Sequence, residues 1–188
     1  MTVLSETVYK YALRILPTLS GNYLEIGVFN GSGFSEVARE SHEKQCYAVD
    51  PFIEDGHTTA HSGMAIGKHM PKQKENFLGN TRDLSNITLF EMTSNQFAQE
   101  LNDQLIDKMN ISLITIDGDH HYPNVVIDFD IAVRLLSTRG GYIIVDDTDV
   151  KDVHQAYEEF LIKFKDRIIK EETVSGSTKV IILDSINE

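Results

Sequence analysis

Short runs of apolar, mostly β-branched residues recur along the chain and are separated by segments with helical periodicity. Runs such as 114–116 and 142–145 contain no charged residue, which is typical of strands that are buried on both faces of a parallel sheet. Between such runs, apolar residues recur at every third or fourth position, as they do over 122–136. This alternation of strand and helix predicts a parallel sheet with helices on both faces.

The pattern predicts a three-layer α/β sandwich built on a Rossmann-like, mostly parallel sheet of about seven strands. Two closing strands flank Ser175-Gly176, a spacing typical of a terminal antiparallel hairpin, which we expect to add one antiparallel edge strand. The strands are expected over residues 23–28, 45–50, 87–91, 114–117, 142–145, 167–174 and 178–183.

Helical spacing, caps and breakers place the helices between these strands. Thr93 and Gln96 have the spacing of a capping box for a single helix that carries Phe97, Leu101 and Leu105. A proline at position 123 suits the first turn of the helix after the fourth strand. Other helices are expected over 4–15, 34–43 and 72–77, and from about residue 150 onward.

Residues 51–80 interrupt this alternation, because they are polar and broken by several glycines and a proline. A stretch of this length with little core pattern is typical of a lid or binding loop, so we interpret 1–188 as one domain with an insertion at 51–80. The insertion contains His57, His61 and His69. The spacing of His57 and His61 suits a zinc site on a helix, but the surrounding Gly and Thr do not favour a helix, so a solvated lid is preferred.

The composition excludes some classes of partner. The net charge of −12 argues against binding to nucleic acid or to an anionic membrane, since both need a basic face. Cys46 is the single cysteine, so no intrachain disulfide can form, which suits a cytoplasmic protein, and we expect this thiol to be buried. No apolar run is as long as a membrane span, and no signal-peptide pattern opens the chain.

Four acidic residues follow two of the predicted strands: Asp117 and Asp119 follow one, and Asp146 and Asp147 follow the other. Open α/β sheets bind ligands at the carboxyl ends of parallel strands, so these acids should lie together. Clustered carboxylates repel one another unless protons or a cation neutralise them, and their hard oxygen atoms suit Mg²⁺, Mn²⁺ or Ca²⁺. The alternatives are that Asp117 bonds loop amides and that Asp147 and Asp149 cap the next helix.

A glycine-rich turn, with Gly27, Gly31 and Gly33, connects the first strand to its helix. Glycines let the backbone approach a ligand closely, and the amino end of a helix favours a phosphate or a carboxylate. The spacing is not that of the dinucleotide pattern G-x-G-x-x-G, which weakens the case for a pyrophosphate site. Asp50 ends the second strand, where an acid can bind the hydroxyls of a ribose, so a nucleoside ligand is expected.

The glycine turn and Asp50 resemble the first two motifs of class I S-adenosylmethionine-dependent methyltransferases. The segment from Glu25 through Gly27 and Phe29 to Gly31 is similar to that of the metal-dependent O-methyltransferases of the catechol and caffeoyl-CoA type. The resemblance implies that Glu25 and Gly27 line the methionine end of S-adenosylmethionine. It places Phe29 and Gly31 in the same cofactor-binding turn, and it implies that Asp50 holds the ribose.

The acids after the fourth and fifth strands resemble the macrocin-type sugar O-methyltransferases still more closely, through Asp-Gly-Asp-His at 117–120 and Asp-Asp at 146–147. This resemblance implies that Asp117, Asp146 and Asp147 bind Mg²⁺ or another divalent cation, and that Asp117 also borders the cofactor. Asp119 falls at the general-base position of the sugar enzymes. His120 falls where the catechol-type enzymes have a catalytic lysine, so both residues are candidate bases, with Asp119 preferred.

The chain also departs from the catechol-type pattern. Gly33 stands where those enzymes usually have Ser or Thr, His120 replaces their lysine, and the amino-terminal region looks short. Ser94 falls where such enzymes contact the adenine. A homodimer is implied only by the resemblance.

We therefore expect an S-adenosylmethionine-dependent, divalent-metal-assisted O-methyltransferase that acts on a small hydroxylated molecule, which is sugar-like, polyketide-linked or catechol-like. An alcohol is a poor nucleophile at neutral pH, and a cation that binds its oxygen lowers its pKa. One alternative is an NAD(P)-dependent oxidoreductase, which the glycine spacing and the lack of a Tyr-x-x-x-Lys pair disfavour. The other is a non-catalytic S-adenosylmethionine-binding module, which the presence of all four acids disfavours.

Overall fold

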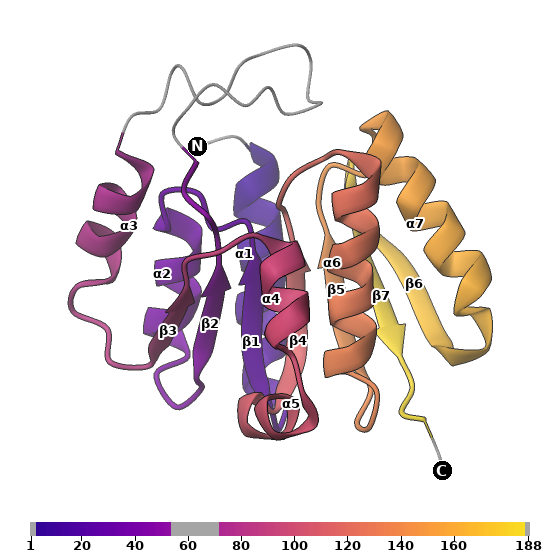
Figure 1. The fold of residues 1–188 in the computed structure, drawn as a ribbon, viewed down its shortest axis with the longest axis horizontal. Helices are drawn as coiled ribbons and strands as arrows, with labels where there is room; N and C mark the ends of the chain where they lie inside the picture. The colour runs from indigo at the N-terminus through magenta and orange to yellow at the C-terminus, as the bar shows by residue number, and fades with distance from the viewer. Residues whose placement is uncertain (1–2, 54–71, 187–188) are drawn as a thin grey trace.

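Seven strands form one sheet in the order β3-β2-β1-β4-β5-β7-β6. The computed structural model describes residues 3–53 and 72–186, and over these residues helices cover both faces of the sheet (Figure 1). The predicted three-layer α/β sandwich is confirmed. The strands are β1 (Asn22–Ile26), β2 (Cys46–Val49), β3 (Ile87–Phe90), β4 (Ile111–Ile116), β5 (Gly141–Val145), β6 (Ile168–Ser175) and β7 (Thr178–Leu183).

The first five strands pair in parallel, and the closing hairpin adds the antiparallel part of the sheet. β7 runs antiparallel to β5, and β6 forms the outer edge by pairing with β7. The antiparallel strand is therefore not the edge strand that the sequence predicts. Because β7 runs against β5, its first residue lies at the carboxyl end of β5, with Lys179 opposite Val145.

The helices lie in two layers (Figure 1). Helices α1, α2 and α3 cover one face, whereas α4, α6 and α7 cover the other, and α5 lies near the amino ends of the strands. Two short 3₁₀ turns, Leu16–Thr18 and Lys165–Arg167, follow α1 and α7. The helices are α1 (Val3–Ile15), α2 (Ser32–Glu40), α3 (Gln73–Thr81), α4 (Ser94–Glu100), α5 (Asp103–Met109), α6 (Tyr122–Leu135) and α7 (Lys151–Lys163).

The helix after β3 and the cap of α7 differ from expectation. The capping box of Thr93 and Gln96 is present, but the single helix expected after it is two helices, because Leu101 is extended and Asn102 caps α5 through the Leu105 amide. Helix α7 has Val150 at its N-cap and no side-chain cap, so the alternative that Asp147 and Asp149 cap this helix is wrong.

Each face of the sheet has its own apolar core, one beneath α4, α6 and α7 and the other beneath α1, α2 and α3. Cys46 is fully buried in the second core, as predicted. Phe77 of α3 is buried there too, which shows that the last part of 51–80 is a packed helix. Residues 54–71, with His57, His61 and His69, lie outside the described residues, so the lid and zinc interpretations stay predictions.

Within the described ranges, none of the helices is both long enough and apolar enough to cross a lipid bilayer.

Candidate active site

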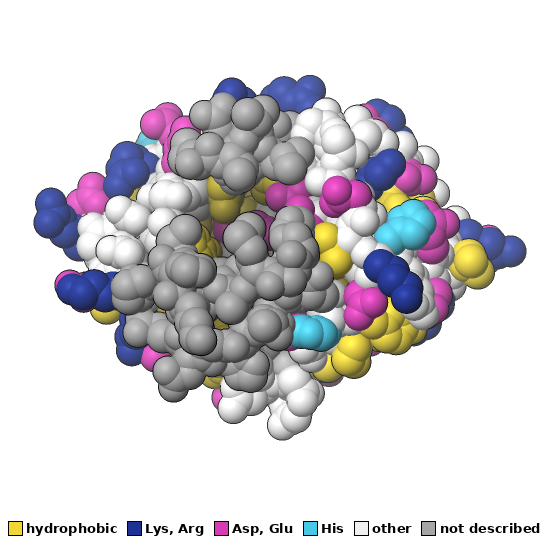
Figure 2. Space-filling model, turned by 90° about the horizontal axis from the view of Figure 1, so that it is seen from above, with side chains coloured by type: hydrophobic (Ala, Val, Ile, Leu, Met, Phe, Trp, Pro, Cys, Tyr) yellow, Lys and Arg dark blue, Asp and Glu magenta, His cyan; other side chains and the backbone are white. Residues whose placement is uncertain are grey.

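The acidic residues singled out from the sequence lie at the carboxyl edge of the parallel strands. Glu25 is in β1, Asp50 follows β2, Asp117 follows β4, and Asp146 and Asp147 follow β5. Because β2, β1, β4 and β5 are neighbours and run in parallel, these residues reach the same edge. Figure 2 looks onto this edge and shows acidic side chains near the middle of the face.

Glu25 is fully buried and is held by two phenols. The Tyr9 hydroxyl of α1 donates to Oε1 at 3.0 Å, and the Tyr23 hydroxyl donates to Oε2 at 2.7 Å. The Tyr23 oxygen also lies 3.0 Å from the Thr115 hydroxyl. Burial raises the pKa of Glu25 to about 7, an effect that the Tyr23 and Tyr9 hydrogen bonds oppose and that the charge of Asp50 adds to.

The glycines of the turn fit close to other parts of the chain. Gly27 has a φ of 86°, and a Cβ there would lie 2.1 Å from the Asp117 carbonyl oxygen. A Cβ on Gly33 would lie 1.9 Å from the Tyr9 ring, and one on Gly31 would meet the Phe77 ring. These glycines thus have packing reasons of their own, and the cofactor contacts implied for Gly27 and Gly31 stay predictions.

Asp50 is buried at the end of β2 and accepts hydrogen bonds from backbone amides on both sides. The Phe29 amide donates to Oδ2 at 2.9 Å, and the Phe52 amide donates to Oδ1 at 2.7 Å. Burial raises the pKa of Asp50, although these amides oppose the shift. Phe29 and Phe52 have φ of 52° and 47°, a left-handed conformation that is uncommon for a residue with a side chain. This strain aims both amides at one carboxylate.

Asp117, His120 and Asp147 come together on the other side of the site. Each offers one ligand atom, and these atoms all lie within 4.8 Å of one another. His120 Nε2 lies 3.4 Å from Asp147 Oδ2. Burial raises the pKa of Asp117 well above its usual range, and the negative charges of Asp146, Asp147 and Glu25 raise it further. A crowded set of acids and one imidazole fits a divalent cation.

Asp146 and Asp147 are adjacent in the chain but have different surroundings. The fully buried Thr178 hydroxyl donates to Asp146 Oδ1 at 2.7 Å, which ties the end of β5 to the start of β7. Asp147 has a φ of 53°, and its carboxylate joins Asp117 and His120. The close group therefore contains His120, whereas the predicted metal ligands were Asp117, Asp146 and Asp147. The predicted assignment of Asp146 as a ligand stays untested.

Asp119, the preferred candidate base, lies in a more exposed place. Its carboxylate accepts from the Asn124 side chain at 2.6 Å and from the His121 amide at 3.1 Å, and it lies 2.6 Å from His121 Nδ1. Partial burial acts to raise the pKa of Asp119, but these hydrogen bonds outweigh it and hold the pKa below its ordinary value. A carboxylate with a lowered pKa is a weak proton acceptor near neutral pH.

Ser94, the predicted adenine contact, is the first residue of α4 and lies near Asp128 of α6. Asp128 is 1% exposed, and neither carboxylate oxygen makes a hydrogen bond of good geometry within the described residues. Burial raises the pKa of Asp128 to about 7, and the nearby Ser94 hydroxyl opposes this shift. A Cβ on Gly118 would lie 3.3 Å from Asp128 Oδ2, so this acid lies directly beneath the loop after β4.

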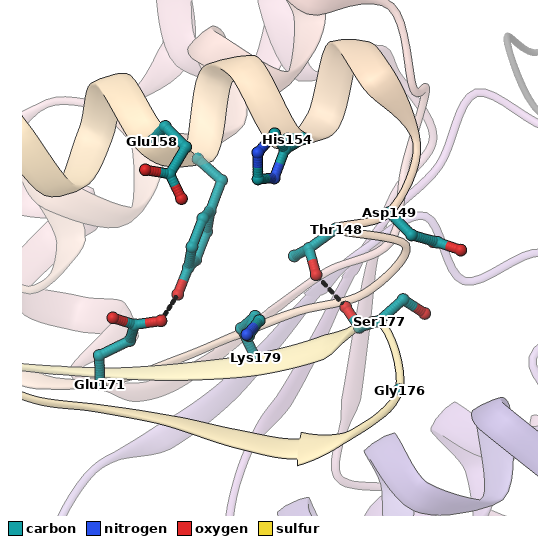
Figure 3. Close-up of a pocket in the computed structure, with 9 residues that line it drawn as sticks. Thr148, Asp149, His154, Glu158, Glu171, Gly176, Ser177 and Lys179 are labelled. Carbon is teal, nitrogen blue, oxygen red and sulfur yellow. Dashed lines mark hydrogen bonds between the residues drawn. The ribbon is translucent and has the colours of Figure 1, made fainter.

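A polar cavity of about 370 Å³ lies between α7 and the closing hairpin, just past the end of β5 (Figure 3). The Thr148 amide donates to the Ser177 carbonyl at 3.0 Å, and the Thr148 hydroxyl donates to the same oxygen. On the opposite side, Tyr157 donates to Glu171 at 2.6 Å. The clamp between Thr148 and Ser177 fixes the backbone that carries Asp146 and Asp147.

Sequence reasoning missed four residues of the site: Tyr9, Tyr23, Asp128 and Thr178. Tyr9 lies in a predicted helix and Tyr23 in a predicted strand, and nothing local marks their hydroxyls as partners of Glu25. Asp128 gave a weak signal, since it is a charged residue next to the apolar stripe of α6. Thr178 becomes recognisable only when β7 is known to run beside β5.

Comparison with known proteins identifies the family. Residues 24–148 match a family model described as a methyltransferase domain. The chain belongs to this methyltransferase family. A curated relative of this methyltransferase is "Uncharacterized protein R132" of Acanthamoeba polyphaga mimivirus, with 28% identity over 131 residues, 66% of this chain and 50% of that protein. The chain thus spans about half the length of that relative.

Solved structures share the fold of this methyltransferase. Cofactor-bound Rv0187 from MTB has a TM-score of 0.66 at 15% identity, covering 97% of this chain and 81% of that chain. The O-methyltransferase TomG from Streptomyces achromogenes, in complex with SAM, has a TM-score of 0.64 at 13% identity, covering 98% of this chain and 82% of that chain. A putative O-methyltransferase from Klebsiella pneumoniae has a TM-score of 0.64 at 20% identity, covering 97% of this chain and 82% of that chain. At these identities the likeness concerns the fold.

The chain is a member of the methyltransferase domain family over residues 24–148, and it shares the fold of solved methyltransferases. The resemblance noted in the sequence is confirmed at this level. The oxidoreductase alternative is set aside, because it predicts a different family.

Proposed function

We propose that this methyltransferase transfers the methyl group of S-adenosylmethionine to a hydroxyl oxygen of a small molecule with the help of a divalent cation. The observation that carries the proposal is the arrangement at the carboxyl edge of the sheet. Two hydrogen-bonded buried acids, Glu25 and Asp50, lie beside a crowded group formed by Asp117, His120 and Asp147. The first pair suits a nucleoside cofactor with an amino-acid tail, and the second suits a cation.

The proposed cofactor-binding residues lie at the ends of β1 and β2. Asp50, fixed by the Phe29 and Phe52 amides, presents a carboxylate that can bind both hydroxyls of the ribose. Glu25 provides an acceptor for the ammonium group of the methionine part. Because both carboxylates are already held by donors from the protein, they can orient the cofactor with little rearrangement, which is what an in-line displacement at the methyl carbon needs.

Asp117 and Asp147 are proposed to hold the cation, together with either His120 or Asp146. When bound, a divalent cation fixes the acceptor hydroxyl and lowers its pKa. The two possible third ligands differ in chemistry, since an imidazole nitrogen suits Mn²⁺ or Zn²⁺ and a third carboxylate suits Mg²⁺. A substrate with neighbouring oxygen atoms, such as a sugar-like diol or a catechol, suits this arrangement, and so does a polyketide-linked hydroxyl.

His120 is proposed as the proton acceptor if it does not bind the cation. A neutral imidazole accepts a proton near neutral pH, whereas the hydrogen bonds on Asp119 make it the weaker base. The two roles of His120 can be separated with His120→Asn. Loss of cation affinity would assign it as a ligand, and loss of the acidic limb of the pH–rate profile with unchanged cation affinity would assign it as the base.

The function is tested by calorimetric titration of S-adenosylmethionine and then Mg²⁺ or Mn²⁺ into metal-free protein, followed by a screen of diols and catechols for methylation. We expect cofactor binding and a separate cation-binding event. Asp147→Asn should abolish the cation event and reduce methylation by about 100-fold or more, because it removes a direct ligand. The matched control is Asp149→Asn, which removes the same charge from an exposed position two residues away. It should change neither cation binding nor methylation.

Each outcome decides a part of the proposal. Cofactor binding without any cation event would contradict the metal-assisted mechanism. Cofactor and cation binding with no methylation of any hydroxylated substrate would favour the non-catalytic binding module. An equal loss in Asp147→Asn and Asp149→Asn would show that overall charge matters rather than the group of Asp117, His120 and Asp147.

A further inference from the structure

We propose that Tyr9 of α1 binds the carboxylate of the amino-acid part of S-adenosylmethionine, so that the amino-terminal helix is part of the cofactor site. This inference rests on the proposed function above. The Tyr9 hydroxyl donates to Glu25 Oε1. When the cofactor enters, its ammonium group replaces this donor on Glu25, and the Tyr9 hydroxyl turns to the cofactor carboxylate. Glu25 therefore accepts as many hydrogen bonds with the cofactor bound as it does from Tyr9 and Tyr23.

Of the two phenols on Glu25, only Tyr9 is placed to meet a ligand. Tyr23 is 0% exposed and its oxygen also lies against Thr115, so it serves as a fixed support for Glu25. Tyr9 is partly exposed and comes from a helix outside the sheet. Its hydroxyl is also within the electrostatic influence of Asp117 and Asp146, which places it near the centre of the site.

The charges of the site explain why a neutral donor is needed there. The amino-acid part of the cofactor carries a positive ammonium group and a negative carboxylate. Glu25 and Asp117 lie in a field of further acids, Asp50, Asp146 and Asp147, which favours the ammonium group and repels the carboxylate. A phenol donates a hydrogen bond to the carboxylate without carrying charge. Burial raises the pKa of Tyr9 well above its usual value, and the charges of Glu25, Asp117 and Asp146 raise it further, so the phenol keeps its proton.

The packing of Tyr9 supports a precise role rather than a loose surface contact. Its ring lies where a side chain on residue 33 would be, since a Cβ on Gly33 would come within 1.9 Å of the Tyr9 Cε2 atom. Helix α1 packs on α2, the helix that contains Gly33. The ring is therefore held by the start of α2, and only the O–H bond of Tyr9 needs to rotate toward the cofactor carboxylate.

The test compares two ligands and two matched variants by calorimetry. S-Adenosylhomocysteine contains the amino-acid part, whereas 5′-methylthioadenosine lacks it. Tyr9→Phe keeps the ring against Gly33 and removes only the hydroxyl. We expect this variant to bind S-adenosylhomocysteine about tenfold or more weakly, as for a lost hydrogen bond to a charged group, and to bind 5′-methylthioadenosine within about twofold of wild type. Tyr11→Phe is the control, because Tyr11 lies on the same helix and donates to Glu172 of β6.

The outcomes separate this inference from the proposed function. Equal weakening of both ligands by Tyr9→Phe would show that Tyr9 only shapes the pocket, and unchanged binding of both would show that it does not contact the cofactor; either result overturns the inference. Weakening of S-adenosylhomocysteine by Tyr11→Phe to the same extent would also overturn it. If wild type binds neither ligand, the proposed function itself fails.

Discussion

The acids at the ends of β1 and β2 differ from those at the ends of β4 and β5 in how the protein compensates them. Glu25 and Asp50 receive four hydrogen bonds, two from tyrosine hydroxyls and two from backbone amides. Asp117 and Asp147 instead crowd together with His120, and burial, with the charges of the neighbouring acids, raises the pKa of Asp117. The first pair is satisfied by hydrogen bonds within the fold, whereas the neighbouring acids of the second group add unfavourable negative charge around Asp117.

On the proposed function, this difference assigns cofactor binding to one side of the sheet edge and chemistry to the other. The β1 and β2 side is arranged in advance and should bind its ligand whether or not a cation is present. The β4 and β5 side carries electrostatic repulsion, which a cation relieves on binding. Variants on the two sides should therefore change different measurements.

The largest effect is expected from Asp117→Asn. Methyl transfer should fall by about 100-fold or more because a cation ligand is lost, and the rise in melting temperature caused by the cation should disappear. The metal-free variant should nevertheless melt at a higher temperature than wild type at pH 8, because it replaces a carboxyl group whose charged form is disfavoured by burial and by the neighbouring acids. Rate measurements check the loss of methyl transfer, and thermal melts with and without Mg²⁺ check the two changes in melting temperature.

The contrasting variant on the other side is Asp50→Asn. It should weaken the binding of S-adenosylmethionine by about tenfold. The asparagine amide cannot accept from both neighbouring backbone amides and also bind the ribose hydroxyls, as a carboxylate does. Its thermal response to the cation should match wild type. If Asp50→Asn removes the cation response, or Asp117→Asn leaves it intact, the division of the site into two sides is wrong.

A smaller effect is expected from Thr178→Val, which removes the hydroxyl that donates to Asp146. Cation affinity should fall by about tenfold, because a residue that orients the acids has been lost. Leaving Asp146 with one partner fewer should lower the melting temperature by roughly 2–12 °C. Thr173→Val is the control on the same hairpin, where the hydroxyl of exposed Thr173 accepts from Lys179. Unchanged cation affinity in Thr178→Val would show that Asp146 is not needed for the site.

The smallest effect concerns stability alone and comes from Asp128→Asn. Burial raises the pKa of Asp128 to about 7, so the folded protein binds its proton more tightly than the unfolded chain does. The wild type should therefore lose stability as the pH rises from about 4 to 7, and the asparagine variant should lose less. At pH 8 the variant should melt roughly 3–10 °C higher. Melting curves from pH 4 to pH 8 that stay parallel for the two proteins would contradict this assignment.

Much of the fold follows from local patterns in the sequence. The buried runs that became β4 and β5, and the capping box at Thr93 and Gln96, were recognised because burial on both faces and helix capping leave short-range signals. The division between α4 and α5 was missed because Leu101 fits the helical spacing while its backbone is extended, and only the Asn102 cap marks the break. The hairpin was predicted, but its place in the sheet depends on long-range pairing.

The site residues that lie at the ends of strands were predicted from the sequence. Glu25, Asp50, Asp117 and the pair after β5 lie together because parallel strands end at one edge. The sequence does not reveal which way each acid turns, and the left-handed backbone at Asp147 aims this residue at Asp117. The partners Tyr9 and Thr178 were missed because they come from distant segments, so their contacts exist only in the assembled fold.

The hydrogen bond between Tyr11 and Glu172 has a consequence for the time at which the site is completed during synthesis. These residues are 161 positions apart, and they join α1 to β6. A ribosome that adds about 5–20 residues per second needs roughly 8–32 seconds to cover that distance. The amino-terminal helix can therefore make this contact only after the closing hairpin has been synthesised, and Thr178 reaches Asp146 only in the same last seconds. A nascent chain that already contains every predicted acid still lacks a finished catalytic centre.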